Sequence, residues 1–145
     1  MAGFLLPEAP KVLGNYQPYV IRNGVGVISG QFPIQDSELL YQGKVGEELS
    51  ISDAKHAIEI ATLNVLSQLS NASDGFAALD SILRMDAYIA SGHSFYQHAE
   101  VVDVASDLLV KVLGQKGGHA RSAIGVSQLP LNSSIELVVS FSIKS

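Results

Sequence analysis

The last segment of the chain, residues 134–143, alternates between large apolar side chains and smaller, mostly polar ones. Successive side chains of a β-strand point to opposite faces of a sheet, so one face of this segment is fully apolar. The apolar set is Ile135, Leu137, Val139, Phe141 and Ile143. The pattern predicts a strand that covers a hydrophobic core with one face and leaves Glu136 on the other.

The remaining segments show four further strand regions and two helical stripes. Residues 19–22 and 25–29 are rich in β-formers and flank Asn23-Gly24, a strong hairpin signal. Apolar residues at helical spacing predict one helix from about Ala54, capped by Ser50 with Asp53 or by Ser52, to just before Asn71. Further elements are expected at 82–89 (strand), 94–113 (helix capped by Ser94 or Ser91, ending at Gly114) and 120–126 (strand).

The resulting order of elements is ββ-α-β-α-ββ. Runs of strands combined with two long helices favour an α+β fold, in which one mixed sheet carries both helices on one face. The length of 145 residues suits one domain, residues 1–145. The sheet face that carries Glu136 would then point to solvent or to a neighbouring subunit.

Composition narrows the class of protein. Charged residues make up 16% of the chain, below the roughly 25% of an average soluble protein, which favours an apolar subunit interface. The nine basic residues are scattered and the net charge is −5, so nucleic acid is an unlikely partner. The absence of cysteine excludes disulfides and fits a reducing compartment. Without a recognisable export signal or a membrane-spanning apolar run, we expect a cytoplasmic protein.

One cation and one anion stand out within residues 118–143, namely Arg121 and Glu136. A guanidinium does not lose its proton, so an arginine in a half-buried sheet requires an anionic partner. That partner is either Glu136 or a ligand such as a carboxylate, which arginine can bind through two parallel hydrogen bonds. Glu136 itself is a candidate general base or water-orienting group.

Other candidate site residues lie near the first hairpin and before Arg121. Tyr19, Ser29 and the backbone at Gly30-Gln31 offer hydrogen bonds to an oxyanion, although strand packing and a turn explain Tyr19 and Ser29 equally well. His119 shares a strand face with Arg121 or lies in an exposed loop. The four histidines lack ligand spacing, so no metal site is expected.

Several short motifs, taken in order, resemble the RidA family, whose members are also called YjgF-like or L-PSP-like proteins. They are Pro18-Tyr19, Ile28-Ser29-Gly30-Gln31, Ala120-Arg121-Ser122, Leu129-Pro130 and Ile135-Glu136. The resemblance implies a chorismate-mutase-like fold and a homotrimer with ligand clefts between subunits. It also implies hydrolysis of reactive enamines and imines to 2-oxo acids and ammonia, without a cofactor.

The resemblance assigns roles to individual residues. Arg121 would hold the substrate carboxylate, Glu136 would position the attacking water, and Tyr19 and Ser29 would line the cleft. Ala123 stands where the deaminases commonly have cysteine. A second hypothesis is therefore a module that binds a 2-oxo acid or another small metabolite without turnover. A third is the endoribonuclease activity with which the family is often labelled, which the scattered basic residues disfavour.

Overall fold

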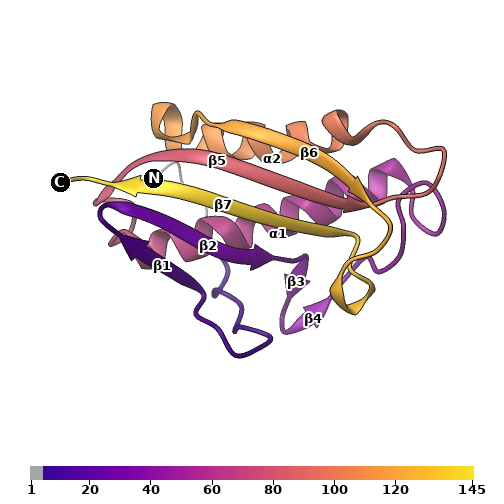
Figure 1. Ribbon diagram of the computed structural model, residues 1–145, viewed down its shortest axis with the longest axis horizontal. Helices are drawn as coiled ribbons and strands as arrows, with labels where there is room; N and C mark the ends of the chain where they lie inside the picture. The colour runs from indigo at the N-terminus through magenta and orange to yellow at the C-terminus, as the bar shows by residue number, and fades with distance from the viewer. Residues whose placement is uncertain (1–4) are drawn as a thin grey trace.

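A five-stranded sheet with the strand order β1-β2-β7-β5-β6 forms the centre of the computed structural model, which describes residues 5–145. Its strands are β1 (Tyr19–Arg22), β2 (Val25–Gln31), β5 (Leu79–Ala90), β6 (Ala120–Val126) and β7 (Ile135–Ile143). Both helices, α1 (Ile51–Ala72) and α2 (His98–Leu113), pass behind the sheet in Figure 1. The expected α+β layout with two helices on one face is confirmed. Residues 1–4 lie outside the described residues. The expected domain, residues 1–145, and the N-terminal segment in which we expect no export signal both include them.

The sheet is mixed, as expected. β1, β2, β7 and β5 pair antiparallel in that order, whereas β5 pairs parallel with the edge strand β6. A parallel pair needs a crossover connection, and α2 supplies it between β5 and β6. α2 therefore lies next to β6, so side chains on the helix-facing side of β6 can reach it.

The strand β7 carries the core as its alternation predicts. Ile135, Leu137, Val139 and Phe141 are all 0% exposed, and the core cluster contains residues from both helices. Burying each such side chain stabilises the fold by roughly 1.5–3 kcal/mol relative to leaving it in water. Because period-2 alternation fixes the faces, Glu136 is turned away from the helices.

The start of α1 is confirmed in detail. Ser50 is the N-cap: its Oγ accepts a hydrogen bond from the Asp53 backbone N–H at 3.0 Å, and an Asp53 carboxylate oxygen accepts from the Ser50 N–H at 2.9 Å. This reciprocal arrangement satisfies two N–H groups that would otherwise lack helical partners. The helix continues to Ala72, two residues beyond the predicted end before Asn71.

The start of α2 differs from the prediction. The helix begins at His98 rather than near Ser94, and its N-cap residue, Gln97, makes no side-chain cap. Phe95 explains the difference, because it is buried like a helix-stripe residue but lies in a turn in which its N–H donates to the Gly92 carbonyl at 3.2 Å. Its ring packs edge-on against His98, with centroids 4.9 Å apart. The C-terminal boundary at Gly114, which has φ 63°, agrees with the prediction.

Four short elements lie in segments for which the sequence predicts loops or turns. β3 (Ile34–Gln35) and β4 (Glu38–Leu39) form a two-stranded hairpin, and the 3-10 helices η1 (Gly114–Gly117) and η2 (Pro130–Asn132) follow α2 and β6. The β3–β4 turn has positive φ at Asp36 (52°) and Ser37 (64°). Two-residue turns of this kind usually contain Asn-Gly or Asp-Gly. Because this one contains Asp-Ser, the sequence does not predict the hairpin.

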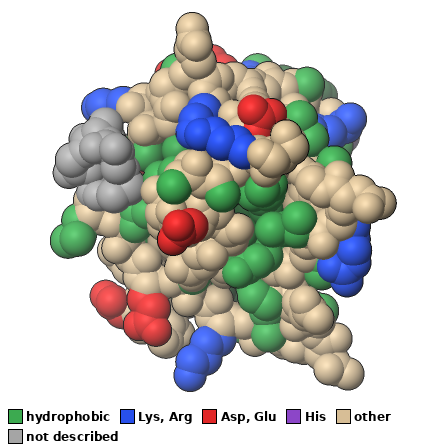
Figure 2. Space-filling model, turned by 90° about the vertical axis from the view of Figure 1, so that its left-hand side faces the viewer, with side chains coloured by type: hydrophobic (Ala, Val, Ile, Leu, Met, Phe, Trp, Pro, Cys, Tyr) green, Lys and Arg blue, Asp and Glu red, His purple; other side chains and the backbone are tan. Residues whose placement is uncertain are grey.

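The surface agrees with the scattered charge of the sequence. On the face in Figure 2, the Lys and Arg side chains stand apart from one another, separated by neutral and acidic groups. Within residues 5–145, no helix is long and apolar enough to cross a membrane.

Candidate functional site: two half-sites on opposite faces of the sheet

Glu136 lies on the helix-free face of β7, directly over Gly30 of β2. A side chain of any size at position 30 would overlap the Glu136 carboxylate, because an added Cβ would meet its Oε2 and Cδ. The register of β2 against β7 shifts between Ile28 and Gln31, so Ser29 and Gly30 form a bulge at this point. Bulges of this kind redirect side chains and often lie next to functional sites.

The Glu136 carboxylate has no hydrogen-bond or ion-pair partner within residues 5–145. The side chain is half-buried, and this burial raises its pKa above the ordinary value of 4.5. Removing a carboxylate from water disfavours its charged form unless a cation or donors replace the water. A cation or a hydrogen-bond donor beside Glu136 would therefore stabilise its charged form.

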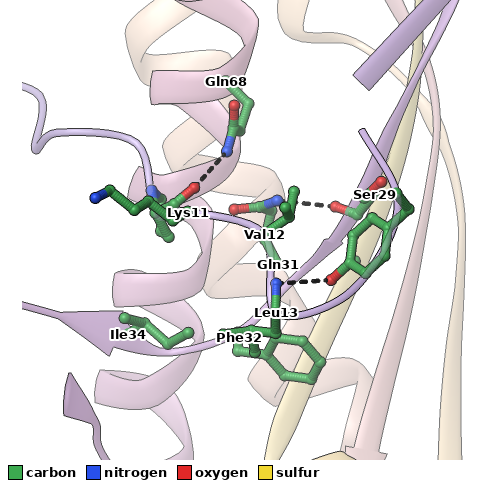
Figure 3. A pocket seen from close by; sticks show the side chains of 11 residues that line it. Lys11, Val12, Leu13, Ser29, Gln31, Phe32, Ile34 and Gln68 are labelled. Atoms are coloured by element: carbon green, nitrogen blue, oxygen red, sulfur yellow. Dashed lines mark hydrogen bonds between the residues drawn. The ribbon is translucent and has the colours of Figure 1, made fainter. Parts of the chain in front are cut away.

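Ser29 and Gln31 use their polar groups within the chain. The Ser29 hydroxyl donates to the Gln17 carbonyl at 2.6 Å, and its backbone N–H donates to the Pro18 carbonyl at 2.9 Å. The Gln31 amide Nε2 donates to the Ser29 carbonyl at 2.9 Å (Figure 3). These bonds hold the bulge in place and tie it to the segment before β1, and the bulge carries Gly30 beside the Glu136 carboxylate.

Two tyrosines, Tyr16 and Tyr19, lie beside this bulge. Tyr19 pairs with the fully buried Ile28 and packs against the core, so it lies on the helix face of the sheet. Tyr16 lines a small pocket, of about 20 Å³, together with Ser29, Gly30 and Gln31 (Figure 3). Its hydroxyl accepts a hydrogen bond from the Leu13 N–H at 3.3 Å. The sequence contained both tyrosines, but only the path of the chain before β1 distinguishes them.

Arg121 lies on the other face of the sheet. It pairs in register with Met85, which is 0% exposed in the core, so the arginine points toward the helix layer. Its Nη1 donates to the Ser106 hydroxyl at 2.9 Å, and its Nη2 donates to the Ala99 carbonyl at 3.3 Å. The same Nη2 lies 2.8 Å from Oδ1 of Asp103. The guanidinium is thus held along one side of α2.

His119 supports the same cluster. Its Nδ1 lies 2.6 Å from the Gly117 carbonyl and its Nε2 lies 2.9 Å from the Ser106 hydroxyl. A carbonyl only accepts, so Nδ1 carries a proton and donates to it. Ser106 consequently joins His119 to Arg121, and His119 orients the cluster from the loop before β6, where it is half-buried.

The sequence left either Glu136 or a ligand as the partner of Arg121, and in the structure Arg121 does not contact Glu136 of the same chain. β7 and β6 are separated by β5, and the two side chains lie on opposite faces. Asp103 takes the place beside the guanidinium instead. Ala99, Asp103 and Ser106 have the spacing i, i+4 and i+7, which places them on one side of a helix. The sequence shows that these three residues share one side of the helix. It does not show that this side contacts Arg121, because that depends on how α2 packs on β6.

A second histidine, His98, lies at the start of α2 near the other end of β6. His98 Nε2 is 3.0 Å from the Ser91 hydroxyl, and a Cβ at Gly125 would clash with both groups. Burial lowers the pKa of His98. Within residues 5–145, no group of three or more His, Asp or Glu side chains is arranged to hold a metal ion.

We expect Glu136→Gln to stabilise the folded chain at pH 7. The pKa of Glu136 is higher in the folded than in the unfolded state, so the protonated carboxyl favours folding. Its contribution is fully present below the unfolded pKa and is lost as the pH rises through the folded pKa. Thermal unfolding should show a higher Tm for Glu136→Gln at pH 7 and no gain at pH 4. The exposed Glu59→Gln has the same change in charge and should show no such pH dependence.

Comparison with known proteins places this chain in a family. The family model described as "YjgF/chorismate_mutase-like, putative endoribonuclease" matches residues 1–143. Protein TCP17 of Trypanosoma cruzi is 32% identical over 136 residues, which cover 93% of this chain and 85% of that protein.

Solved structures agree with this assignment. Atu1372 of Agrobacterium tumefaciens, described as having unknown function, is 32% identical, with a TM-score of 0.90 over 98% of this chain and 87% of that one. A Shewanella oneidensis protein with the endoribonuclease description is 35% identical, with a TM-score of 0.92 over 97% and 93% of the two chains. The extent of these matches shows that the chain belongs to the YjgF/chorismate-mutase-like family, as the motifs around Arg121 and Glu136 predicted.

Proposed function

We propose that the protein is an enamine/imine deaminase, or a near relative, that acts on a small carboxylate in a cleft between two copies of the chain. Family membership supports a small-molecule-binding or deaminase role in general. The observation that carries the finer proposal is the state of Glu136, which is half-buried, raised in pKa and without a partner within residues 5–145. The proposal places the protein in the cytoplasm as a homotrimer.

The two half-sites suggest how such a cleft would be built. One copy would contribute the face with Gly30 and Glu136, and the neighbouring copy would contribute Arg121 from its edge strand β6. The exposed apolar side chains Val27 on β2 and Ile124 on β6 lie beside these elements and would be covered. Because homo-oligomers close by rotation, each copy would donate both halves to two different sites.

The chemistry needs only these side chains and water. Arg121 would bind the carboxylate and fix the position of the imine carbon, which is already electrophilic. Glu136 would accept a proton from the attacking water and return it to the departing nitrogen, roles that a carboxyl group with a raised pKa suits. Addition of water and loss of ammonia convert the imine into a 2-oxo acid, with no cofactor and no change of oxidation state.

Subunit mixing tests the proposal directly. The substrate 2-aminoacrylate, supplied from serine by a dehydratase, should release ammonia faster with the wild-type protein than in buffer. Arg121→Ala and Glu136→Ala should each be inactive. Refolding the two variants together in equal amounts should restore about a quarter of wild-type activity, because that share of sites receives both intact residues by chance. No acceleration by the wild-type protein would exclude the deaminase, and no recovery on mixing would exclude the shared site.

The alternative function is binding without turnover. It is favoured by Ala123, which leaves no thiol beside Arg121, and by the fixed attachment of the guanidinium to α2. Calorimetry with pyruvate and other small carboxylates would then show binding that requires Arg121, while the ammonia assay stays at the buffer rate.

The distribution of basic residues gives little support to endoribonuclease activity. Phosphate contacts require clustered basic side chains, whereas the nine Lys and Arg residues here are dispersed and the net charge is −5. We expect rigorously purified protein to leave RNA intact with and without a chelator.

A further inference from the structure

The guanidinium of Arg121 already has an internal carboxylate as its partner. Nη2 lies 2.8 Å from Asp103 Oδ1, a distance typical of a strong charge-assisted contact. The other two partners of Arg121 within residues 5–145, the Ser106 hydroxyl and the Ala99 carbonyl, are neutral. Asp103 therefore supplies the only negative charge that contacts this guanidinium within residues 5–145.

The two members of the pair differ in how firmly they are held. The Arg121 side chain is 25% exposed and is anchored by Ser106 and Ala99, whereas the Asp103 side chain is 62% exposed. The Asp103 side chain has no other hydrogen-bond or ion-pair partner within residues 5–145, so it can rotate into solvent and lose only the ion pair. An exposed pair of this kind contributes little to stability, because water and side-chain entropy oppose it.

We infer that Asp103 occupies the place of a ligand carboxylate on Arg121 and sets the charge selectivity of the site. This inference rests on the proposed function, in which Arg121 holds the carboxylate of a small molecule. An incoming carboxylate displaces Asp103 from Nη2, while Ser106 and Ala99 keep the guanidinium in position. Asp103 therefore lowers the affinity for every anion by competing for Arg121.

The displaced Asp103 also affects which anions are accepted. It stays on the same helix turn beside the site, and its charge repels a ligand in proportion to the charge of that ligand. A molecule with one carboxylate meets this repulsion once, whereas a dicarboxylate of similar size brings a second negative charge to it. The site consequently selects small monocarboxylates over dicarboxylates.

The test measures the affinity of the intact protein for pyruvate and for oxaloacetate, by calorimetry at low ionic strength. Asp103→Asn removes the charge and keeps the size of the side chain. We expect it to bind pyruvate about two- to fivefold more tightly than the wild type, the range of an exposed ion pair. Its gain for oxaloacetate should be larger, so that the preference for pyruvate shrinks. Asp107→Asn, one turn farther along α2 and not in contact with Arg121, is the control with the same change in charge.

Each outcome separates this inference from the function on which it rests. Equal or weaker pyruvate binding by Asp103→Asn, in a protein whose wild type binds pyruvate through Arg121, would show that Asp103 orients the arginine instead of competing with the ligand. That result overturns the inference and leaves the proposed function standing. An equal gain for Asp107→Asn would reduce the effect to net charge and also overturn it. If Arg121→Ala binds pyruvate as well as the wild type does, the proposed function fails, and the inference fails with it.

Discussion

Replacing Arg121 by alanine is expected to abolish detectable binding of small carboxylates and the associated turnover. The loss of a hydrogen-bonded charge partner from a desolvated site costs about 2–5 kcal/mol, which corresponds to an affinity about 30- to several-thousand-fold lower. Arg121→Lys should recover only part of this, because an ammonium group cannot reproduce the two parallel hydrogen bonds of a guanidinium. Calorimetry with pyruvate and the ammonia assay measure the two effects.

We expect Arg121→Ala to fold normally, so that a loss of binding or turnover can be attributed to the missing guanidinium. Asp103 is largely exposed and can be solvated when Arg121 is absent, and Ser106 keeps its hydrogen bond to His119. Thermal unfolding should therefore show only a small change in Tm. Arg22→Ala is the matched control, since the Arg22 guanidinium is exposed and donates to the neighbouring Ile21 carbonyl. Unchanged carboxylate binding in Arg121→Ala would remove Arg121 from the site.

Periodicity predicted the parts of the fold that depend on burial. The alternation in β7 and the stripe of α1 follow from one apolar face meeting the core, and both agree with the structure. Where a local contact replaced periodicity, prediction failed. Phe95 is buried, but it belongs to a turn and not to the predicted helix. The β3–β4 turn has Asp36 and Ser37 at the positive-φ positions where glycine is common.

The candidate site could be predicted as a set of residues but not as an arrangement. The alternation of β7 placed Glu136 on the face away from the helices, which is where it lies. The face of Arg121 depends on its register against Met85, and the identity of its partner depends on how α2 packs on β6. Register and helix packing are tertiary properties, so Asp103, Ser106 and Tyr16 were missed although each is visible in the sequence.

The low content of charged residues favoured a subunit interface, and the separation of Arg121 from Glu136 suggests a function for that interface. Under the proposed function, a single chain holds two incomplete half-sites and would have a functional reason to associate, beyond covering apolar surface. Val27 and Ile124 are 43% and 38% exposed on the strands that carry or flank these half-sites. Association that buries them would also desolvate Glu136 further and increase the need for a cation beside it. Assembly and catalysis would then depend on the same contact.

Gly30→Ala is expected to reduce turnover by about a hundredfold while leaving the fold nearly intact, because a misplacement of about 1 Å in a reacting group can cost that much. The new methyl group would occupy the position of the Glu136 carboxylate, with Oε2, Cδ and Cγ as its nearest neighbours. These atoms belong to the end of a flexible side chain, so Glu136 can move aside without disturbing β7. Ammonia release should fall, whereas the affinity for pyruvate, which depends on Arg121, should change much less.

Gly118→Ala provides the control for the glycine-to-alanine change itself. An added Cβ at Gly118 has the Gln115 carbonyl as its nearest neighbour at 3.5 Å, which is ordinary contact, and Gly118 has φ −65°. This variant should keep both turnover and Tm. If Gly30→Ala retained full turnover, the position of the Glu136 carboxylate over Gly30 would be irrelevant to the reaction. The role of Glu136 in orienting water would then have to be abandoned, even if Arg121 proved essential.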